Sequence, residues 1–144
     1  MSHRVFDVLQ LLLKMRKDRS VAQSKRVQAE YQRVRNFNEQ IQSYANEYQS
    51  QWLNTAKNGD SVMHLQTQAA FGDKLRATAQ SQQPEVMALE GQSRQALDQA
   101  LHDSERLKTL QKFLAEQQRQ KKHHQERQDE RALEDALQAR HRSR

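Results

Sequence analysis

The fold is decided by residues 27–52, which read VQAEYQRVRNFNEQIQSYANEYQSQW. Within this stretch one series of residues recurs every seven positions, and a second series follows it by four. The first series is Val27, Val34, Ile41 and Tyr48, and the second is Tyr31, Asn38, Ala45 and Trp52. Alternating spacings of four and three residues are typical of a coiled-coil seam, with the first series at d and the second at a positions. The stretch therefore predicts a helix that packs along one stripe.

The predicted helix extends from Ser2 to Lys57, because this range contains no Gly and no Pro. Its pattern is interrupted at Lys57-Asn58-Gly59-Asp60. Asn-Gly favours left-handed backbone conformations, and either Asp60 or Ser61 is suited to cap a following helix. The sequence therefore predicts a turn at residues 57–60.

A second seam follows this turn. Its two series are Val86, Ser93, Ala100, Leu107 and Leu114, and, three residues later, Leu89, Ala96, Asp103 and Leu110. A four-residue connection makes two helices antiparallel neighbours. The predicted fold class is all-α, an antiparallel two-helix coiled-coil hairpin. A homodimer of extended helices would use the same stripes and remains the alternative.

Folding the chain at Gly59 places opposite each other those residues whose numbers add to about 117. An apolar clasp then joins Phe6, Leu9 and Leu13 to Leu107, Leu110, Phe113 and Leu114. We expect this clasp to account for the leucines of residues 8–13. The hairpin takes up residues 1–115 in this register, and residues 116–144 form a polar C-terminal extension, partly helical or frayed, for which disorder remains an alternative. Pro84 is predicted to kink the second helix or to start a new one at Gln83–Pro84.

The composition excludes most enzyme classes. Leu, Ile, Val and Phe total 27 of 144 residues, which is below the level that usually fills a compact core, and Gln alone contributes 23. The chain has no Cys, and its three isolated Gly residues cannot build a phosphate-binding loop. His123 and His124 are adjacent, so on a helix they point about 100° apart and cannot chelate one ion. We expect no catalysis, no cofactor and no metal.

The positive charge is concentrated in residues 1–35. Nine Lys and Arg stand there against three acids, so these residues account for the whole formal charge of +6. Four of them, Lys14, Arg16, Lys17 and Arg19, are candidate electrostatic contacts for a partner. No recognition module or stacking platform accompanies them, which disfavours nucleic acid. Residues 5–13 are apolar but too short to cross a bilayer, and we expect an intracellular, soluble protein with an acidic protein partner.

An excess of aromatic residues lies beside the seam near the turn. Phe37 and Tyr44 flank the a positions of the first helix, and Phe71 falls at matching height on the second. The aromatic band, as we call it here, comprises Phe37, Ile41, Tyr44, Tyr48, Phe71 and Leu75. Two helices cannot bury all of these side chains, and a contiguous exposed apolar band marks a contact site. The alternative is that long Gln and Arg stems cover the band.

At these residues the sequence resembles the FliJ family, the small coiled-coil proteins of the bacterial flagellar type III export apparatus. The matching elements are Tyr44-Ala-Asn46-Glu47-Tyr48, Asn54-Thr55, Asn58-Gly59, Phe71 and Leu75, with Phe6-x-x-Leu9 at the N-terminal end. A C-terminal third rich in Lys, Arg and Gln also fits. The resemblance covers most of the chain and is most specific in residues 41–75.

The resemblance implies an antiparallel two-helix stalk, similar to the stalk subunit of rotary ATP synthases, that works without catalysis. It implies three partners: the hexameric export ATPase, whose central pore it occupies, the cytoplasmic domain of the export gate, and export chaperones. It also implies gate binding through Ile41, Tyr44, Tyr48, Phe71 and Leu75, with Phe37, Thr78 and Gln82 on the same face. The protein would be cytoplasmic and peripheral at the inner face of the inner membrane, reached only through the export complex. Two other functions remain open: the equivalent stalk of a virulence injectisome, and a generic coiled-coil export chaperone or adaptor.

Overall fold

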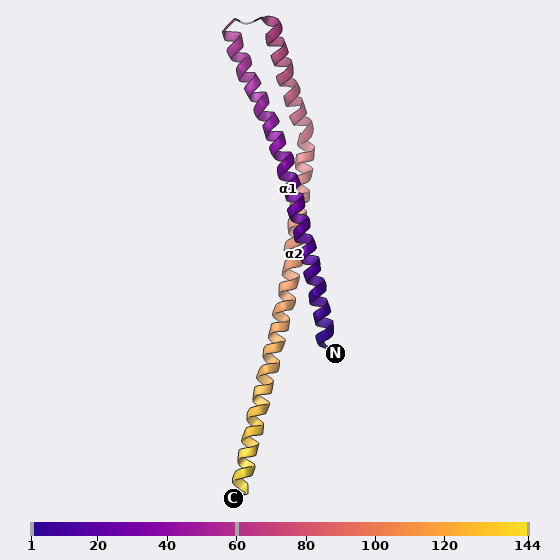
Figure 1. The fold of residues 1–144 in the computed structure, drawn as a ribbon, viewed down its shortest axis with the longest axis vertical. Helices are drawn as coiled ribbons and strands as arrows, with labels where there is room; N and C mark the ends of the chain where they lie inside the picture. The colour runs from indigo at the N-terminus through magenta and orange to yellow at the C-terminus, as the bar shows by residue number, and fades with distance from the viewer. Residues whose placement is uncertain (1, 60, 144) are drawn as a thin grey trace. The chain divides into compact units, whose positions relative to one another are not determined.

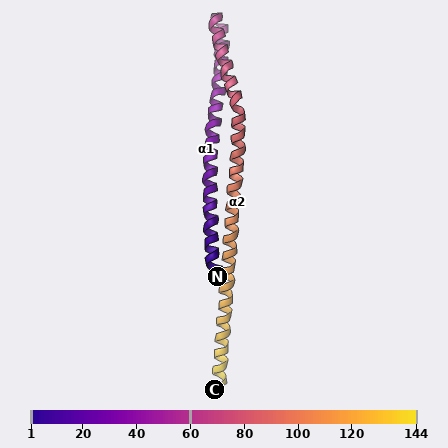
Figure 2. The same ribbon diagram turned by 90° about the vertical axis from the view of Figure 1, so that its right-hand side faces the viewer.

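The computed structural model describes residues 2–59 and 61–143. It contains two helices, α1 (Ser2–Lys57) and α2 (Val62–Arg142), and no strand in the part of the chain that it describes. Residues group into two compact units, the turn unit (Asp18–Leu101) and the terminal unit (Met1–Lys17 with His102–Arg144). Figures 1 and 2 show the ribbon from two sides, with α1 in indigo to magenta and α2 in rose to yellow. The all-α helical hairpin is confirmed.

The turn that joins the helices has the backbone that Asn-Gly predicts. Gly59 has φ of +75°, in the left-handed region, where a side chain would be strained. The N–H of Asn58 donates to the Asn54 carbonyl at 3.1 Å, which closes the last turn of α1. The Ser61 hydroxyl oxygen accepts from the His64 N–H at 3.2 Å and so caps the start of α2. Asp60, the other candidate cap, lies outside the described residues.

Burial in the turn unit follows the predicted seam. Each of its seam residues is buried or half-buried, the most enclosed being Ser24, Val34, Asn38, Ile41, Ala45, Ala79, Val86 and Ala100. Contacts between the helices lie in the predicted register: the Asn38 side chain reaches the Ala79 carbonyl, and the Tyr48 ring lies beside that of Phe71. Small side chains at the centre of the seam let the two backbones approach closely.

The terminal unit has a shorter seam. Leu107 and Asp103 are buried there, while Phe6, Leu13, Leu110 and Leu114 are half-buried. The rings of Phe6 and Phe113 lie 6.0 Å apart with an angle of 56° between their planes. From residue 115 to residue 143 every residue is exposed, although the helix continues to Arg142. The exposed residues of this segment bury little side-chain area, and burial in tertiary packing is what stabilises most protein helices.

Pro84 lies inside α2, which is a single helix from Val62 to Arg142. The prediction that a new helix starts at Gln83–Pro84 is therefore wrong. Pro84 itself is exposed, while Gln82 and Val86 on either side face the seam, so packing holds the chain helical through the proline. A bend at this point remains a prediction.

Candidate partner-binding surfaces

Three aromatic rings of the aromatic band are accessible in the turn unit. Phe37 is 53% exposed, and Tyr44 and Phe71 are each 46% exposed. Phe37 and Tyr44 are seven residues apart, so they lie on one flank of α1, whereas Phe71 belongs to α2. Large apolar side chains exposed together are typical of contact surfaces rather than of a solvated face.

The band is composed from both helices. The ring centroids of Tyr48 and Phe71 lie 4.8 Å apart with an angle of 57° between the planes, a favourable tilted geometry. The Tyr44 hydroxyl accepts a hydrogen bond from Gln40 Nε2 at 3.3 Å, within one turn of α1. These contacts hold the rings against the hairpin while leaving much of each ring in solvent.

The remaining band residues have different environments. Ile41 is only 8% exposed and belongs to the buried seam, so it supports the band from beneath and does not present its side chain to a partner. Tyr48 and Leu75 are half-buried. The six residues predicted as one surface therefore divide into three exposed rings, two half-buried side chains and one core residue.

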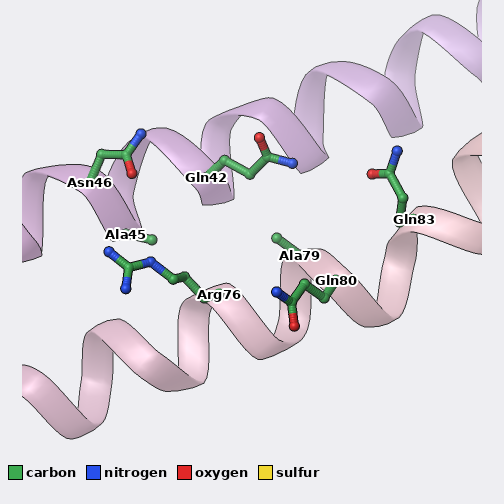
Figure 3. Close-up of a pocket in the computed structure, with 7 residues that line it drawn as sticks. All are labelled: Gln42, Ala45, Asn46, Arg76, Ala79, Gln80 and Gln83. Carbon is green, nitrogen blue, oxygen red and sulfur yellow. The ribbon is translucent and has the colours of Figure 1, made fainter.

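The other flank of the seam carries a polar groove (Figure 3). It has a volume of about 570 Å³ and is lined by Gln42, Ala45, Asn46, Arg76, Ala79, Gln80 and Gln83. The guanidinium of Arg76 extends from α2 toward α1 and donates to Gln49 Oε1. Amide side chains and alanines form the rest of the lining, so this groove offers hydrogen bonds but no pair of groups suited to acid–base chemistry.

The predicted basic contacts divide between the two units. In the terminal unit Lys14 and Arg16 are exposed, whereas Lys17 is half-buried at a seam position and already has an interaction within the chain. Arg19, in the turn unit, is exposed. Three of the four cations are thus accessible, and Lys17 is the least suited to contact a partner.

The apolar residues of the N-terminal segment form a surface that the sequence reasoning missed. Their exposed members are Val5, Val8, Leu11, Leu12 and Met15, here called the N-terminal stripe. The expectation that the clasp accounts for the leucines of residues 8–13 is wrong, because only Leu13 is half-buried there and Leu9 is itself exposed. The spacing of Val5, Val8, Leu12 and Met15 (three, four, three) is a second apolar series beside the seam, and would have revealed it.

Two exposed ion pairs perturb the acids and bases within them. Hydrogen bonding from Arg33, at 2.7 Å, lowers the pKa of Glu30 below its ordinary value and raises that of Arg33. Arg119 does the same to the pKa of Glu116 through a bond of 2.8 Å. Both pairs join positions i and i+3 of one helix, which is ordinary surface support for a helix. Among the described residues, no three His, Asp or Glu side chains come together in a way that could hold a metal ion.

Neither helix, over its described residues, is long and apolar enough to cross a membrane. Exposed large apolar side chains occur along both helices, and the aromatic band and the N-terminal stripe each bring several of them together.

The comparisons with known proteins point to one family. The family model described as "Flagellar FliJ protein" matches residues 3–144, which is essentially the whole chain. No curated protein and no solved structure matches the chain significantly. Proteins of the matched family are non-enzymatic and related to flagellar type III export. With a match over this length, and a helical hairpin as its fold, the chain belongs to the flagellar FliJ protein family.

Proposed function

We propose that this protein is a non-enzymatic stalk and adaptor of the flagellar type III export apparatus, which binds the export ATPase ring and the export gate and escorts export chaperones. The observation that carries the proposal is the family match over residues 3–144. It is supported by the exposed rings of Phe37, Tyr44 and Phe71, which lie where the resemblance implies gate binding.

The aromatic band has the physical properties of an anchor for a protein partner. Aromatic side chains bury a large area while losing few rotamers, and they dominate the binding energy of many interfaces. Tyr44 also keeps a hydroxyl that can bond to a partner at the edge of the contact. We infer that the gate domain covers Phe37, Tyr44 and Phe71, with Tyr48 and Leu75 at the base of the contact.

The N-terminal stripe and its neighbouring cations suit a second partner. We infer that this region contacts the export ATPase, with Val8, Leu12 and Met15 supplying apolar area and Lys14 and Arg16 complementing acidic side chains. Electrostatic complementarity steers association and orients the partners. Chaperone binding rests on the family membership alone.

Charge reversal tests the ATPase contact. Lys14→Glu with Arg16→Glu is expected to lower stimulation of the purified ATPase at least severalfold. Lys25→Glu with Arg26→Glu is the matched control, because these residues are also exposed on α1 and the charge change is the same. Equal stimulation by both variants would contradict a specific contact at Lys14 and Arg16.

Complementation tests the function as a whole. Expression of the protein in a flagellated strain lacking its own stalk protein is expected to restore swarming. We propose that it acts in the cytoplasm, peripherally at the inner membrane and held there by the export complex. Failure to swarm, combined with rescue of injectisome secretion, would assign the protein to a virulence system. Absence of both the ATPase and the gate domain from pull-downs would instead favour a generic chaperone or adaptor.

A further inference from the structure

A buried amide side chain interrupts the apolar seam of the turn unit. Asn38 is 3% exposed and stands at an a position between Val34 and Ile41, both of which are buried. Its Nδ2 donates to the backbone carbonyl of Ala79 on the other helix at 2.9 Å, and its Oδ1 accepts from Gln42 Nε2 at 2.8 Å. Both polar atoms of this amide are therefore satisfied, one of them across the hairpin.

The seam itself does not determine how the helices align along their length. Apolar and small residues recur every seven positions on both helices, so sliding one helix by a heptad again places seam residues opposite seam residues. The Asn38 amide reaches the Ala79 backbone carbonyl past a small alanine side chain. If α2 slid so that Asn38 met Val86, the branched side chain of Val86 would stand between the amide and the backbone carbonyl. Its Oδ1 would keep the bond from Gln42, which lies on the same helix, but its Nδ2 would lose the acceptor across the hairpin. A buried N–H without an acceptor is costly, so this slide is opposed specifically by Asn38.

The turn opposes the slide in the other direction. Moving Asn38 toward Gly72 would shift the reversal of the chain into the end of α1, and Gly59 would lose its left-handed position. The opposite slide only unwinds the start of α2, where Val62, Met63 and His64 are all exposed. The turn is therefore a weak barrier to the slide that Asn38 blocks.

We propose that Asn38 selects the register of the two helices and is thereby the positioning residue of the aromatic band. A heptad slide displaces the helices by about 10 Å. It would separate Phe71 from Tyr48, whose rings now lie 4.8 Å apart. The band, composed from both helices, thus exists in one register only. Its use by a partner rests on the proposed function, whereas the register claim does not.

Gln82 provides a matched control. It is half-buried at a seam position of α2, and its Oε1 is buried without a hydrogen-bond partner. This oxygen makes no hydrogen bond that would depend on the native register. Replacing Gln82 with Leu removes a buried polar group while leaving the bond between Asn38 and Ala79 intact.

Spin-label distances can measure the register directly, because the chain has no Cys of its own. A Cβ on Gly72 would lie 3.7 Å from the Tyr48 Cβ, so counting five residues along each helix places Ser43 opposite Ala77. Labels at Ser43→Cys and Asp98→Cys, both exposed, are then separated by 21 residues of α2, or roughly 30 Å along the axis. The expected slide shortens this separation by about 10 Å.

The labelled protein with Asn38 is expected to show one distance between its two spin labels. The labelled Asn38→Val variant is expected to show a second population, in which this distance is shorter by about 10 Å. Gln82→Leu should keep the single distance, and Asn38→Gln, which retains an amide, should restore it at least in part. A single native distance in Asn38→Val would overturn the proposal. No partner is present in this experiment, so its result is independent of the gate and ATPase assignments.

Discussion

At the scale of single residues, small side chains decide how closely the two helices pack. Ala45 is 1% exposed and Ala79 is 3% exposed, and both lie in the seam of the turn unit. Gly72 lies at the same seam, where an added Cβ would make an ordinary contact with Tyr48. Tight packing around short side chains leaves larger ones, such as Phe37 and Tyr44, on the outside of the seam.

The two other glycines differ in backbone conformation, so replacing each with Ala should change the stability of the protein in opposite directions. Gly91 is exposed within α2, and an added Cβ would meet nothing within 4 Å. Gly91→Ala should therefore stabilise the protein by up to about 1 kcal/mol, the difference in helix propensity. Gly59→Ala should destabilise it by about 1 kcal/mol, because the φ of +75° is strained for Ala. Urea unfolding followed by circular dichroism measures both, and equal effects of the two substitutions would contradict the turn geometry.

The pair of Glu30 and Arg33 predicts a small dependence of stability on pH. Hydrogen bonding to Arg33 lowers the folded-state pKa of Glu30, so its contribution is present above the unfolded pKa and is lost as pH falls through the folded pKa. NMR chemical shifts of the Glu30 carboxyl carbon, followed against pH, should show a pKa below the ordinary value of Glu. The substitution Arg33→Gln should raise the pKa of Glu30. An unchanged pKa in that variant would show that the pair does not persist in solution. The effect on stability should be slight, since both groups are exposed.

The burial of individual residues could be predicted from the sequence where the heptad periodicity determines which side chains face the other helix. The two seam series, which include Val34, Ala45 and Trp52, predict burial correctly, because side chains at a and d positions face the partner helix. Ile41 is predicted both as seam and as partner contact; it is buried in the seam, and its contact with a partner stays a prediction. The N-terminal stripe was missed because the apolar residues near the N-terminus form two series on different sides of the helix. The clasp accounts for the series that faces α2 and leaves the N-terminal stripe unexplained.

At the scale of elements, α2 continues through Pro84 although proline is the poorest helix former. Pro84 has no N–H to donate to the Gln80 carbonyl, and its ring crowds the preceding turn. Pro84→Ala should therefore stabilise the protein, by up to about 3 kcal/mol if none of the strain is relieved by a bend. Thermal unfolding of the two proteins measures this difference. An unchanged midpoint would show that α2 accommodates the proline without cost.

The last part of α2 is predicted to be the least protected element. Lys121 Nζ lies 3.2 Å from the His3 ring Nε2, but residues 122–143 are all exposed. A chain ending at Lys122 should keep the free energy of unfolding of the full chain to within about 0.5 kcal/mol. In the full-length protein, amide hydrogens of residues 122–142 should exchange faster than those of the seam. Strong protection there would contradict a helix without packing partners.

Element boundaries were predictable at the turn and not at the proline. Asn58-Gly59 marked the end of α1 because few other sequences adopt left-handed backbone so readily, and α1 does end at Lys57. Pro84 suggested a boundary on local grounds, whereas the seam residues Gln82 and Val86 hold the helix together through contacts across the hairpin. The division at residues 115 and 116 stays a prediction.

At the scale of the whole molecule, the chain has few apolar residues, and their placement separates the seam from the exposed surface. Only 35% of the residues are hydrophobic, and the seam uses many of them. Three exposed aromatic rings lie in the aromatic band and five exposed aliphatic side chains in the N-terminal stripe, and other exposed apolar side chains are spread along the helices. Composition predicted a solvated two-helix protein, but the partners follow only from family membership, since no spacing of residues specifies a gate or an ATPase.

The central claim is that the aromatic band binds the export gate. The most direct test is the affinity of the purified cytoplasmic gate domain, measured by titration calorimetry, for the native protein and for Tyr44→Ala with Phe71→Ala. Leu97→Ala with Leu101→Ala is the control, because it removes two exposed apolar side chains elsewhere in the turn unit. We predict that Kd rises at least tenfold for the aromatic variant alone, with helicity by circular dichroism unchanged. Equal affinity of all three proteins for the gate domain would contradict the claim.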